Sequence, residues 1–463
     1  MLALHPEYKL RKTKTNILLY RFDYDTMDLA DQKALHPNAA ILLSLFDGKN
    51  SIDDIHCAIK YLFEYSTDEA SKILNNFIDE WKKYLTDTSK RIRYDKPNDF
   101  IIDSNQVNQE IILCESPLYI GLNITQQCNR NCIYCYAENS SIREFPEMTI
   151  AHLENIVNQI IECEMEFVIL SGGDPFLRHE MFNILEMLNS ANIPVQLSTK
   201  QFLNKGTINR LRHCGIEHIQ LSIDSLDDNI AYKMIGVHNY ASKMIDTLVE
   251  LLNSGFKVST NTVVCSINYG SLKNLVEKFI ECGVSNIRLS QYIRSAYRHN
   301  DNLFITDKQA QELMEYVIEL RQNKIYSNVT FGNAISDKKA PIEKRIEKFV
   351  DRSICSAGRM SMVIMPNGMV IPCEQLPCRS EFIVGDATKQ TIMEIWNSEK
   401  FYSFIMPDRE RMRNTICFNC KFYDKCINVK GLCMRDSWKA FNTPFQINPF
   451  CPNAESVNGL RLS

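Results

Sequence analysis

The hydrophobic pattern of residues 1–95 predicts a small unit with a β-rich start and three helices. The apolar run ILLYRF is typical of a strand, and AAILLSLF has the length of a short helix. Ser51 begins the next helix, and Ser66 with Glu69 three positions later forms a capping box for a third. Strands followed by three helices indicate a winged-helix-like domain.

Between residues 116 and 304 strands and helices alternate regularly. Apolar runs typical of buried strands are separated by amphipathic stretches such as HLENIVNQIIECEM and LKNLVEKFIECGV. Six βα units in succession predict an α/β fold with a parallel sheet, wound as a partial (β/α)6 TIM-type barrel or doubly wound. The strand runs are LYIGLNI, FVILSG, PVQLST, HIQLSI, KVSTNTVV and NIRLSQ.

The remaining segments have weaker patterns. Residues 96–115 are polar and contain Pro97, which predicts a linker. Residues 305–350 are charged and predict a helical bridge. Residues 351–463 are rich in Cys, Pro and Asn, so we expect metal ligands, more than a large apolar core, to hold them together.

Composition and charge narrow the class of protein. Of 463 residues, 45% are hydrophobic and 23% are charged, which is ordinary for a globular protein. The net charge of −4 supplies no basic field for nucleic acid. No apolar run reaches the roughly 18 residues of a membrane span, and the N-terminus has no apolar segment of signal-peptide type. We therefore expect a cytoplasmic protein with no membrane and no nucleic-acid partner.

Cysteine is the unusual residue, with 17 in the chain. A reducing cytosol disfavours structural disulfides, so dense clustering of cysteines points to metal. The dense groups span 128–135 and 355–451. The scattered cysteines are expected to be small buried hydrophobes; these are Cys57, Cys114, Cys163, Cys214, Cys265 and Cys282.

The first dense group follows the first strand of the predicted barrel. Cys128, Cys132 and Cys135 can hold three irons of a [4Fe–4S] cube and leave the fourth iron open. Loops after the strands of such folds form the active face. Zinc is the alternative, but a structural zinc site needs four ligands, and no fourth Cys or His lies nearby in the sequence.

This CxxxCxYC pattern, which includes Tyr134, resembles the radical S-adenosylmethionine (radical SAM) superfamily. Further motifs of the domain support the resemblance. The run Gly172–Gly173–Asp174–Pro175 is similar to the family's GGEP motif, and Ser222 with Asp224 matches its S-x-D motif. The resemblance implies that S-adenosylmethionine contacts Tyr134, Gly172, Gly173, Asp174, Pro175, Ser198, Lys200, Ser222 and Asp224.

The resemblance also implies the chemistry. The amino and carboxylate groups of S-adenosylmethionine would chelate the open iron, and its reductive cleavage would yield a 5′-deoxyadenosyl radical that abstracts hydrogen from a C–H bond. One position departs from the family, which often has an Arg about a dozen residues after the S-x-D serine. Here the stretch reads YKMIGVHNY, and Lys233 is the candidate substitute.

The second dense group resembles the SPASM domain, the auxiliary-cluster module of radical enzymes that modify peptides. Its run VIMPNGMVIPC also predicts a β-hairpin with Asn-Gly at the turn. The resemblance implies two auxiliary [4Fe–4S] clusters, hence three in all. One would be ligated by Cys417, Cys420, Cys426 and Cys451, and the other by Cys355, Cys373 and Cys433.

Two points about this group stay open. The spacing between Cys426 and Cys433 is x6 where the family has x3. The cluster with three thiolates is either completed by Cys378 or has an open fourth iron, which could bind a substrate thiolate. A zinc-ribbon-like structural domain is the alternative for the whole group.

The segment ALHPNAAILLSLFDGKNSIDDI resembles the PqqD-like peptide-recognition domain of peptide-maturation enzymes. Such domains bind an extended leader peptide as an added strand. A winged helix alone more often suggests DNA binding, but the only basic run, KLRKTKTN, is short.

The order of these domains is similar to that of maturases that install thioether links (sactipeptide or ranthipeptide type) in ribosomally made peptides. The partners implied are a precursor peptide, bound through its leader, and an electron donor such as flavodoxin or ferredoxin. The alternatives are carbon–carbon or ether cross-linking, decarboxylation, epimerisation, sulfatase-maturing oxidation, and a non-catalytic scaffold. The resemblance assigns no general acid or base.

Overall fold

The computed structural model describes residues 1–24, 26–93, 95–137, 146–323, 326, 328–332 and 340–456. The chain divides into two compact units, Met1–Glu115 and Ser116–Ser463.

The first unit begins with a three-stranded antiparallel sheet in the order β2-β3-β4. A short two-stranded ladder pairs β1 with β5, and three helices lie between β4 and β5 along the chain. The elements are β1 (Leu2–Leu4), β2 (Tyr8–Lys12), β3 (Ile17–Asp23), β4 (Asp28–Leu35), α1 (Pro37–Leu45), α2 (Ile52–Phe63), α3 (Thr67–Trp81) and β5 (Leu85–Asp87).

Both predicted starts of helices α2 and α3 are confirmed. The Ser51 hydroxyl caps α2 by accepting from the backbone N–H of Asp54, and the Asp54 side chain accepts from the backbone N–H of Ser51. Ser66 and Glu69 form the same reciprocal pair at α3. Each box satisfies backbone donors that a helix leaves unpaired at its first turn.

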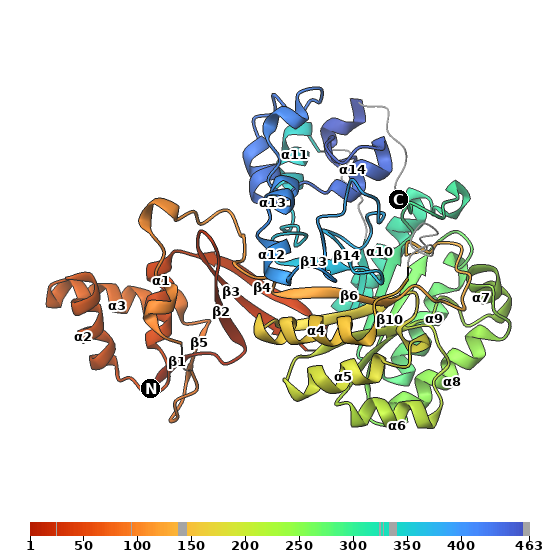
Figure 1. The fold of residues 1–463 in the computed structure, drawn as a ribbon, viewed down its shortest axis with the longest axis horizontal. Helices are drawn as coiled ribbons and strands as arrows, with labels where there is room; N and C mark the ends of the chain where they lie inside the picture. The colour runs from red at the N-terminus through yellow and green to blue at the C-terminus, as the bar shows by residue number, and fades with distance from the viewer. Residues whose placement is uncertain are drawn as a thin grey trace. The chain divides into compact units, whose positions relative to one another are not determined.

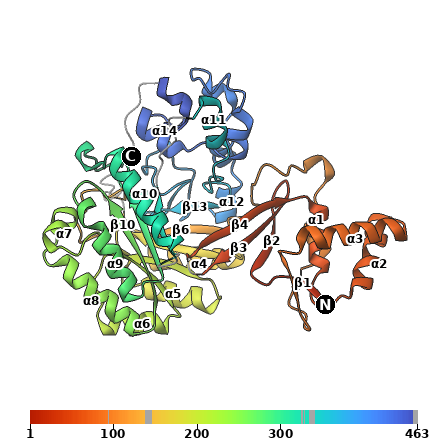
Figure 2. The same cartoon turned by 180° about the vertical axis from the view of Figure 1, so that it is seen from behind.

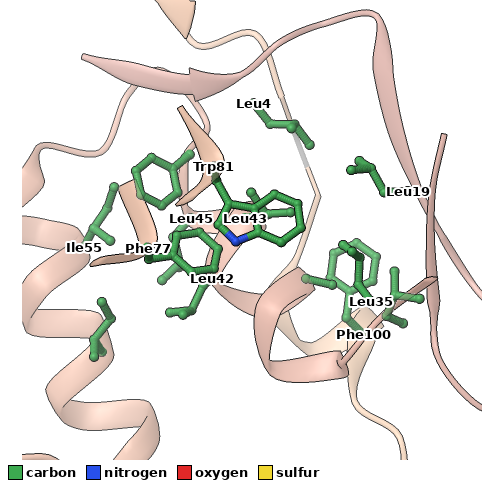
Figure 3. Packing of buried hydrophobic residues seen from close by; sticks show 14 of the residues in the cluster. Leu4, Leu19, Leu35, Leu42, Leu43, Leu45, Ile55, Phe77, Trp81 and Phe100 are labelled. Carbon is green, nitrogen blue, oxygen red and sulfur yellow. The ribbon is translucent and has the colours of Figure 1, made fainter. Parts of the chain in front are cut away.

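The core of this unit is apolar and rich in rings (Figure 3). Phe77 of α3 stacks between Phe46 and Trp81, with ring centroids 5.9 and 5.6 Å away. Leu19 and Leu35 extend the core onto strands β3 and β4. Burial of these side chains holds the helices on the sheet.

Residues 96–115, predicted as a linker, pack on the first unit. Phe100, in the 3₁₀ turn Pro97–Phe100, is 4% exposed and belongs to its core. Asn16 donates through Nδ2 to the carbonyls of Asn108 and Ile111 at 2.7 and 2.9 Å. The polar composition of residues 96–115 did not predict this packing, because the packing depends on one aromatic side chain and on backbone carbonyls.

The second unit is built on a parallel sheet that runs in chain order from β6 to β12. The α/β class and the parallel core predicted from the sequence are confirmed. The strands are β6 (Tyr119–Thr125), β7 (Phe167–Gly172), β8 (Val195–Thr199), β9 (His218–Ser222), β10 (Lys257–Val264), β11 (Asn286–Gln291) and β12 (Val329–Gly332).

Helices follow each of the first six strands and lie on the outside of the curved sheet (Figures 1 and 2). Their apolar faces pack on the strands, which leaves the loops after the strands free to form a site. These helices are α4 (Ile150–Glu162), α5 (Met181–Ser190), α6 (Lys205–His213), α7 (Asp228–Ile235), α8 (Tyr240–Asn253), α9 (Leu272–Cys282) and α10 (Asp307–Gln322). Helix α11 (Ile342–Val350) follows β12 and lies beside the C-terminal helices α13 (Glu399–Ile405) and α14 (Met434–Phe441) in Figures 1 and 2.

The segment 305–350, predicted as a helical bridge, also contains a strand. Between α10 and α11 the short strand β12 pairs in parallel with β11 and widens the core sheet. Its four residues, VTFG, are too few to show an alternating pattern.

The C-terminal region joins the same sheet. Strand β13 (Ser361–Ile364) pairs in parallel with β6, and the predicted hairpin to β14 (Met369–Ile371) is confirmed. Gly368, at the turn, has a φ of +84°, which favours glycine. The other elements are β15 (Gly385–Asp386), α12 (Ile392–Trp396), α13 (Glu399–Ile405), a π-helical turn (Asp424–Val429) and α14 (Met434–Phe441).

Among the residues that the structure describes, no helix is both long and apolar enough to cross a membrane.

Candidate functional site

The three cysteines of the first group open onto one cavity of about 870 Å³ beyond the ends of strands β6 and β7. Residues from the C-terminal region form another part of its wall. The lining residues are Asn123, Thr125, Gln126, Cys128, Arg130, Cys132, Cys135, Tyr136, Ala137, Ser171, Gly172, Gly173, Tyr297, Arg298, Met365, Pro366, Glu374 and Leu376. The cavity thus lies between the two cysteine-rich parts of the chain.

Gly172 and Gly173 fit the loop after β7 closely against the cysteine loop. The Gly173 N–H donates to the Thr125 carbonyl at 2.7 Å. A Cβ at Gly172 would lie 2.3 Å from the Thr125 carbonyl oxygen, and one at Gly173 would lie 2.1 Å from that of Gln127. Real Cβ atoms do not approach this closely, so the contact requires glycine at both positions.

Asp174, the next residue, has its carboxylate turned into the protein. It accepts from the Thr199 hydroxyl at 2.9 Å and from the Lys200 backbone N–H at 3.1 Å. Burial raises the pKa of Asp174, and these donors oppose the rise. Pro175 then begins a short 3₁₀ turn. The carboxylate of Asp174 therefore ties the glycine loop to the end of β8.

Tyr134, Lys200 and Asp224 form a buried polar cluster. The Asp224 carboxylate accepts from the Tyr134 hydroxyl and from the Val263 N–H at 2.8 Å. The Lys200 ammonium lies 3.4 Å from it. Burial is the main reason that the pKa of Tyr134 is raised well above its ordinary value, and Asp224 adds to the rise.

Of the predicted cofactor contacts, only Gly172 and Gly173 line this cavity. Seven described residues are absent from its wall: Tyr134, Asp174, Pro175, Ser198, Lys200, Ser222 and Asp224. Ser198 ends β8 and Ser222 ends β9, where the Ser222 carbonyl accepts from the Tyr240 hydroxyl at 2.8 Å. Their cofactor role stays a prediction.

Two charged residues that sequence reasoning missed fix the cysteine loop. Glu147 accepts from the Thr125 hydroxyl at 2.8 Å and from the Gln126 N–H at 2.7 Å. Arg298 donates through Nη1 to the Cys132 carbonyl at 2.9 Å. Glu147 lies 21 residues beyond Gln126, and Arg298 lies 166 residues beyond Cys132. No sequence motif marks either residue.

Tyr136 and Glu374 join the two cysteine groups across the cavity. Tyr136 follows Cys135, Glu374 follows Cys373, and their side chains are hydrogen-bonded. Glu374 and burial raise the pKa of Tyr136 well above its ordinary value.

In the second group, four thiols line one further cavity of about 520 Å³: Cys417, Cys420, Cys426 and Cys451. Burial, followed by the neighbouring thiols Cys451, Cys426 and Cys420, raises the pKa of Cys417 to about 12. This is the set that the sequence assigned to one auxiliary cluster.

Cys355, Cys373 and Cys433 form the other set of neighbours. Burial raises the pKa of Cys373 to about 11, and Cys355 contributes to the rise. Burial also raises the pKa of Cys433, again with a contribution from Cys355. For Cys378, burial alone raises the pKa to about 11, with no contribution from another thiol.

The arrangement of the thiols fits clusters better than single zinc ions. One Zn²⁺ holds its thiolates at about 2.3 Å, so its ligands must converge on a point. Over the described ranges, no group of three or more His, Cys, Asp or Glu side chains converges in that way. A cube is ligated at separate irons, so its thiolates need not converge.

The scattered cysteines are mostly as expected. Cys114, Cys214 and Cys265 are buried, and Cys163 and Cys282 are half-buried. The prediction was wrong for Cys57, which is exposed. It lies on α2 two positions from Ile55 and from Ile59, the buried residues of that helix, so it faces the other side.

Comparison with known families assigns the first cysteine region and the first part of the second. Residues 122–291 match the radical SAM superfamily, and residues 355–421 match the SPASM iron–sulfur cluster-binding domain. Among curated relatives, GTP 3′,8-cyclase of Campylobacter lari is 24% identical, over 55% of this chain and 79% of that protein. PqqA peptide cyclase of Bradyrhizobium diazoefficiens is 23% identical, over 62% of this chain and 74% of that protein.

Two solved structures share the fold. Streptococcus suis SuiB bound to its precursor peptide SuiA has a TM-score of 0.66 at 18% identity, over 97% of this chain and all of SuiB. The structure of anSMEcpe with S-adenosylmethionine and the Cp18Cys peptide has a TM-score of 0.53 at 17% identity, over 73% of this chain and 95% of that one. The chain therefore contains a radical SAM domain, followed by an SPASM iron–sulfur cluster-binding domain.

Proposed function

We propose that this enzyme modifies a ribosomally made precursor peptide by closing a cysteine thioether cross-link. The observation on which the proposal rests is the cavity of about 870 Å³ that lies between the first cysteine loop and Glu374 and Leu376 of the second cysteine group. A substrate held there would contact both cysteine regions. The fold shared with SuiB and anSMEcpe, both solved with peptides, and the similarity to a peptide cyclase support a peptide substrate.

Cys128, Cys132 and Cys135 would hold the first [4Fe–4S] cluster. With S-adenosylmethionine bound, the cluster supplies a carbon-centred radical that removes a hydrogen atom from an unactivated C–H bond. The carbonyls of Gly172 and Gly173 would accept from the methionine amino group. The other proposed cofactor contacts act either directly or by shaping the loops; they are Asp174, Pro175, Tyr134, Ser198, Lys200, Ser222 and Asp224.

The chain's own residues position the substrate and exclude water. Arg298 and Glu147 hold the cysteine loop in one conformation through four hydrogen bonds. Met365, Pro366 and Leu376 give the cavity an apolar wall. Such a wall keeps water away from reactive intermediates.

The second cysteine group would bind two auxiliary [4Fe–4S] clusters, for three in all. Cys417, Cys420, Cys426 and Cys451 supply four thiolates to one. Cys355, Cys373 and Cys433 supply three to the other. The fourth iron of that cluster would then be open to a substrate cysteine, with Cys378 as the alternative ligand.

The first unit would bind the leader of the peptide as a PqqD-like recognition domain. Over the described residues, β4 pairs with β3 alone, and most of its side chains are at least partly exposed. Its open edge can take an added strand. Lys33 of β4 lies 4.3 Å above the ring of Trp81 on α3, so a leader along β4 would lie near Trp81. A flavodoxin or ferredoxin would supply electrons.

The test is anaerobic incubation of the reconstituted enzyme with S-adenosylmethionine, a reductant and a cysteine-containing precursor peptide. We expect 5′-deoxyadenosine and a product two hydrogens lighter in which one cysteine no longer reacts with iodoacetamide. A lighter product in which every cysteine still reacts would indicate a carbon–carbon link and not a thioether. The similarity to a peptide cyclase favours this second candidate. A Cys128/Cys132/Cys135→Ala chain should form neither product, and a wild-type chain that cleaves no S-adenosylmethionine would refute the proposal.

A further inference from the structure

Arg352 places its guanidinium at the four-thiol site of Cys417, Cys420, Cys426 and Cys451. It follows helix α11 and lines the same cavity as the four thiols. Its Nη1 donates a hydrogen bond to the Cys426 Sγ at 3.3 Å. A cation therefore contacts one of the proposed cluster ligands directly.

Several further contacts fix this guanidinium. Nη2 donates to the carbonyls of Cys426 and Gly431, both at 2.8 Å. Nη1 also donates to the Phe349 carbonyl at 3.2 Å, and the guanidinium carbon lies 4.5 Å from the Phe349 ring centroid. A planar fork with fixed donors makes this set of contacts, which a single ammonium cannot reproduce.

The charge of Arg352 is not balanced by a carboxylate. Among the described residues no Asp or Glu forms an ion pair with it, and its hydrogen-bond partners are three carbonyls and one sulfur. Arg435, beside Cys433 in the three-thiol set, differs because Asp436 pairs with it at 2.7 and 3.2 Å. The positive charge of Arg352 therefore acts on the thiolates around it.

We propose that Arg352 raises the reduction potential of the cluster bound by Cys417, Cys420, Cys426 and Cys451, which makes that cluster the better electron acceptor of the two auxiliary clusters. Reduction adds one negative charge to a cluster, and a nearby cation with an N–H donor to sulfur stabilises the reduced state more than the oxidised one. The inference rests on the iron–sulfur assignment of the proposed function.

The experiment is a redox titration, followed by electron paramagnetic resonance, of the full chain carrying Cys128/Cys132/Cys135→Ala so that only auxiliary clusters give signals. Arg352→Gln removes the charge, and Arg352→Lys keeps the charge but not the fork. Arg409 is the matched control, because it donates to the carbonyls of Phe418 and Cys420 in the same region without a bond to sulfur. Iron and sulfide are counted first, with Cys417→Ala identifying the irons of this site.

We expect Arg352→Gln to lower one midpoint potential by at least 59 mV, a tenfold change for a one-electron couple. Arg352→Lys should lower it less, and Arg409→Gln and Arg409→Lys should leave it unchanged. If the midpoint potential of Arg352→Gln equals that of Arg409→Gln, the inference about Arg352 is overturned, and the proposed function is unaffected. If Arg352→Gln does not assemble the cluster, Arg352→Lys against Arg409→Lys decides by the same criterion. If Cys417→Ala loses no iron, the cluster assignment fails, and the inference fails with it.

Discussion

The Lys200 ammonium lies 3.4 Å from the carboxylate of Asp224, and the Asp224 side chain is fully buried. The two residues come from the ends of neighbouring strands β8 and β9. Tyr134, from the cysteine loop, donates to the same carboxylate. The pair therefore connects the cysteine loop to two strands.

Asp224→Asn should destabilise this part of the barrel by about 3 kcal/mol, because breaking a buried pair leaves a cation without its counter-charge. Hydrogen exchange of the β9 and β10 amides measures the change. Glu250→Gln, which removes the exposed partner of Lys205 at 3.8 Å, should change exchange by less than about 0.5 kcal/mol. Equal effects of the two substitutions would contradict the structural role of Asp224.

Gly173→Ala should reduce S-adenosylmethionine cleavage about 100-fold, because a shift of roughly 1 Å at a reacting site can cost that much. Its Cβ would lie 2.1 Å from the Gln127 carbonyl oxygen. Gly270→Ala is the matched control, since nothing lies within 4 Å of a Cβ there. Rates of 5′-deoxyadenosine formation that are the same in both variants would show that the loop tolerates the displacement.

Cys378→Ala should keep about twelve irons per chain, whereas Cys433→Ala should retain about eight if the cluster depends on three protein thiolates. The reason is that Cys433 has Cys355 as a neighbour, and Cys378 has no thiol among the groups that affect its pKa. Iron and acid-labile sulfide analysis checks this. Loss of about four irons in both variants would make Cys378 the fourth ligand.

Leader binding should change the fluorescence of Trp81. The chain has three tryptophans, and Trp81 is the only one in residues 1–115, so Trp396→Phe/Trp438→Phe isolates its signal. We expect a saturable change with the leader segment and none with a peptide that lacks it. Leader binding detected by calorimetry without a change at Trp81 would place the leader away from β4.

The sequence predicted what depends on local spacing. The capping boxes at Ser51 and Ser66, the hairpin turn at Gly368 and the alternating barrel elements each need only a few neighbouring residues, and the structure confirms them. The grouping of the distant cysteines came from a family resemblance, since spacing alone cannot bring residue 355 beside residue 433.

Other features depend on contacts between distant parts of the chain. Glu147, Arg298, Glu374 and Arg352 reach the cysteine sites across long sequence separations, and each looks like an ordinary surface charge in the sequence. Strand β4 was not predicted because DLADQKAL is an exposed edge strand without a continuous apolar face. Contacts of this kind become visible only once the sheet topology is known.

The pairing of β13 with β6 has a consequence for the catalytic domain itself. Six of the seven β6 residues are buried, and β6 lies between β7 and β13 in the sheet. Without the C-terminal hairpin, β6 would become an apolar edge with unpaired N–H and C=O groups, a template for aggregation. The C-terminal hairpin therefore also protects the edge of the catalytic sheet from aggregation. A radical SAM domain expressed without it would self-associate before its activity could be measured.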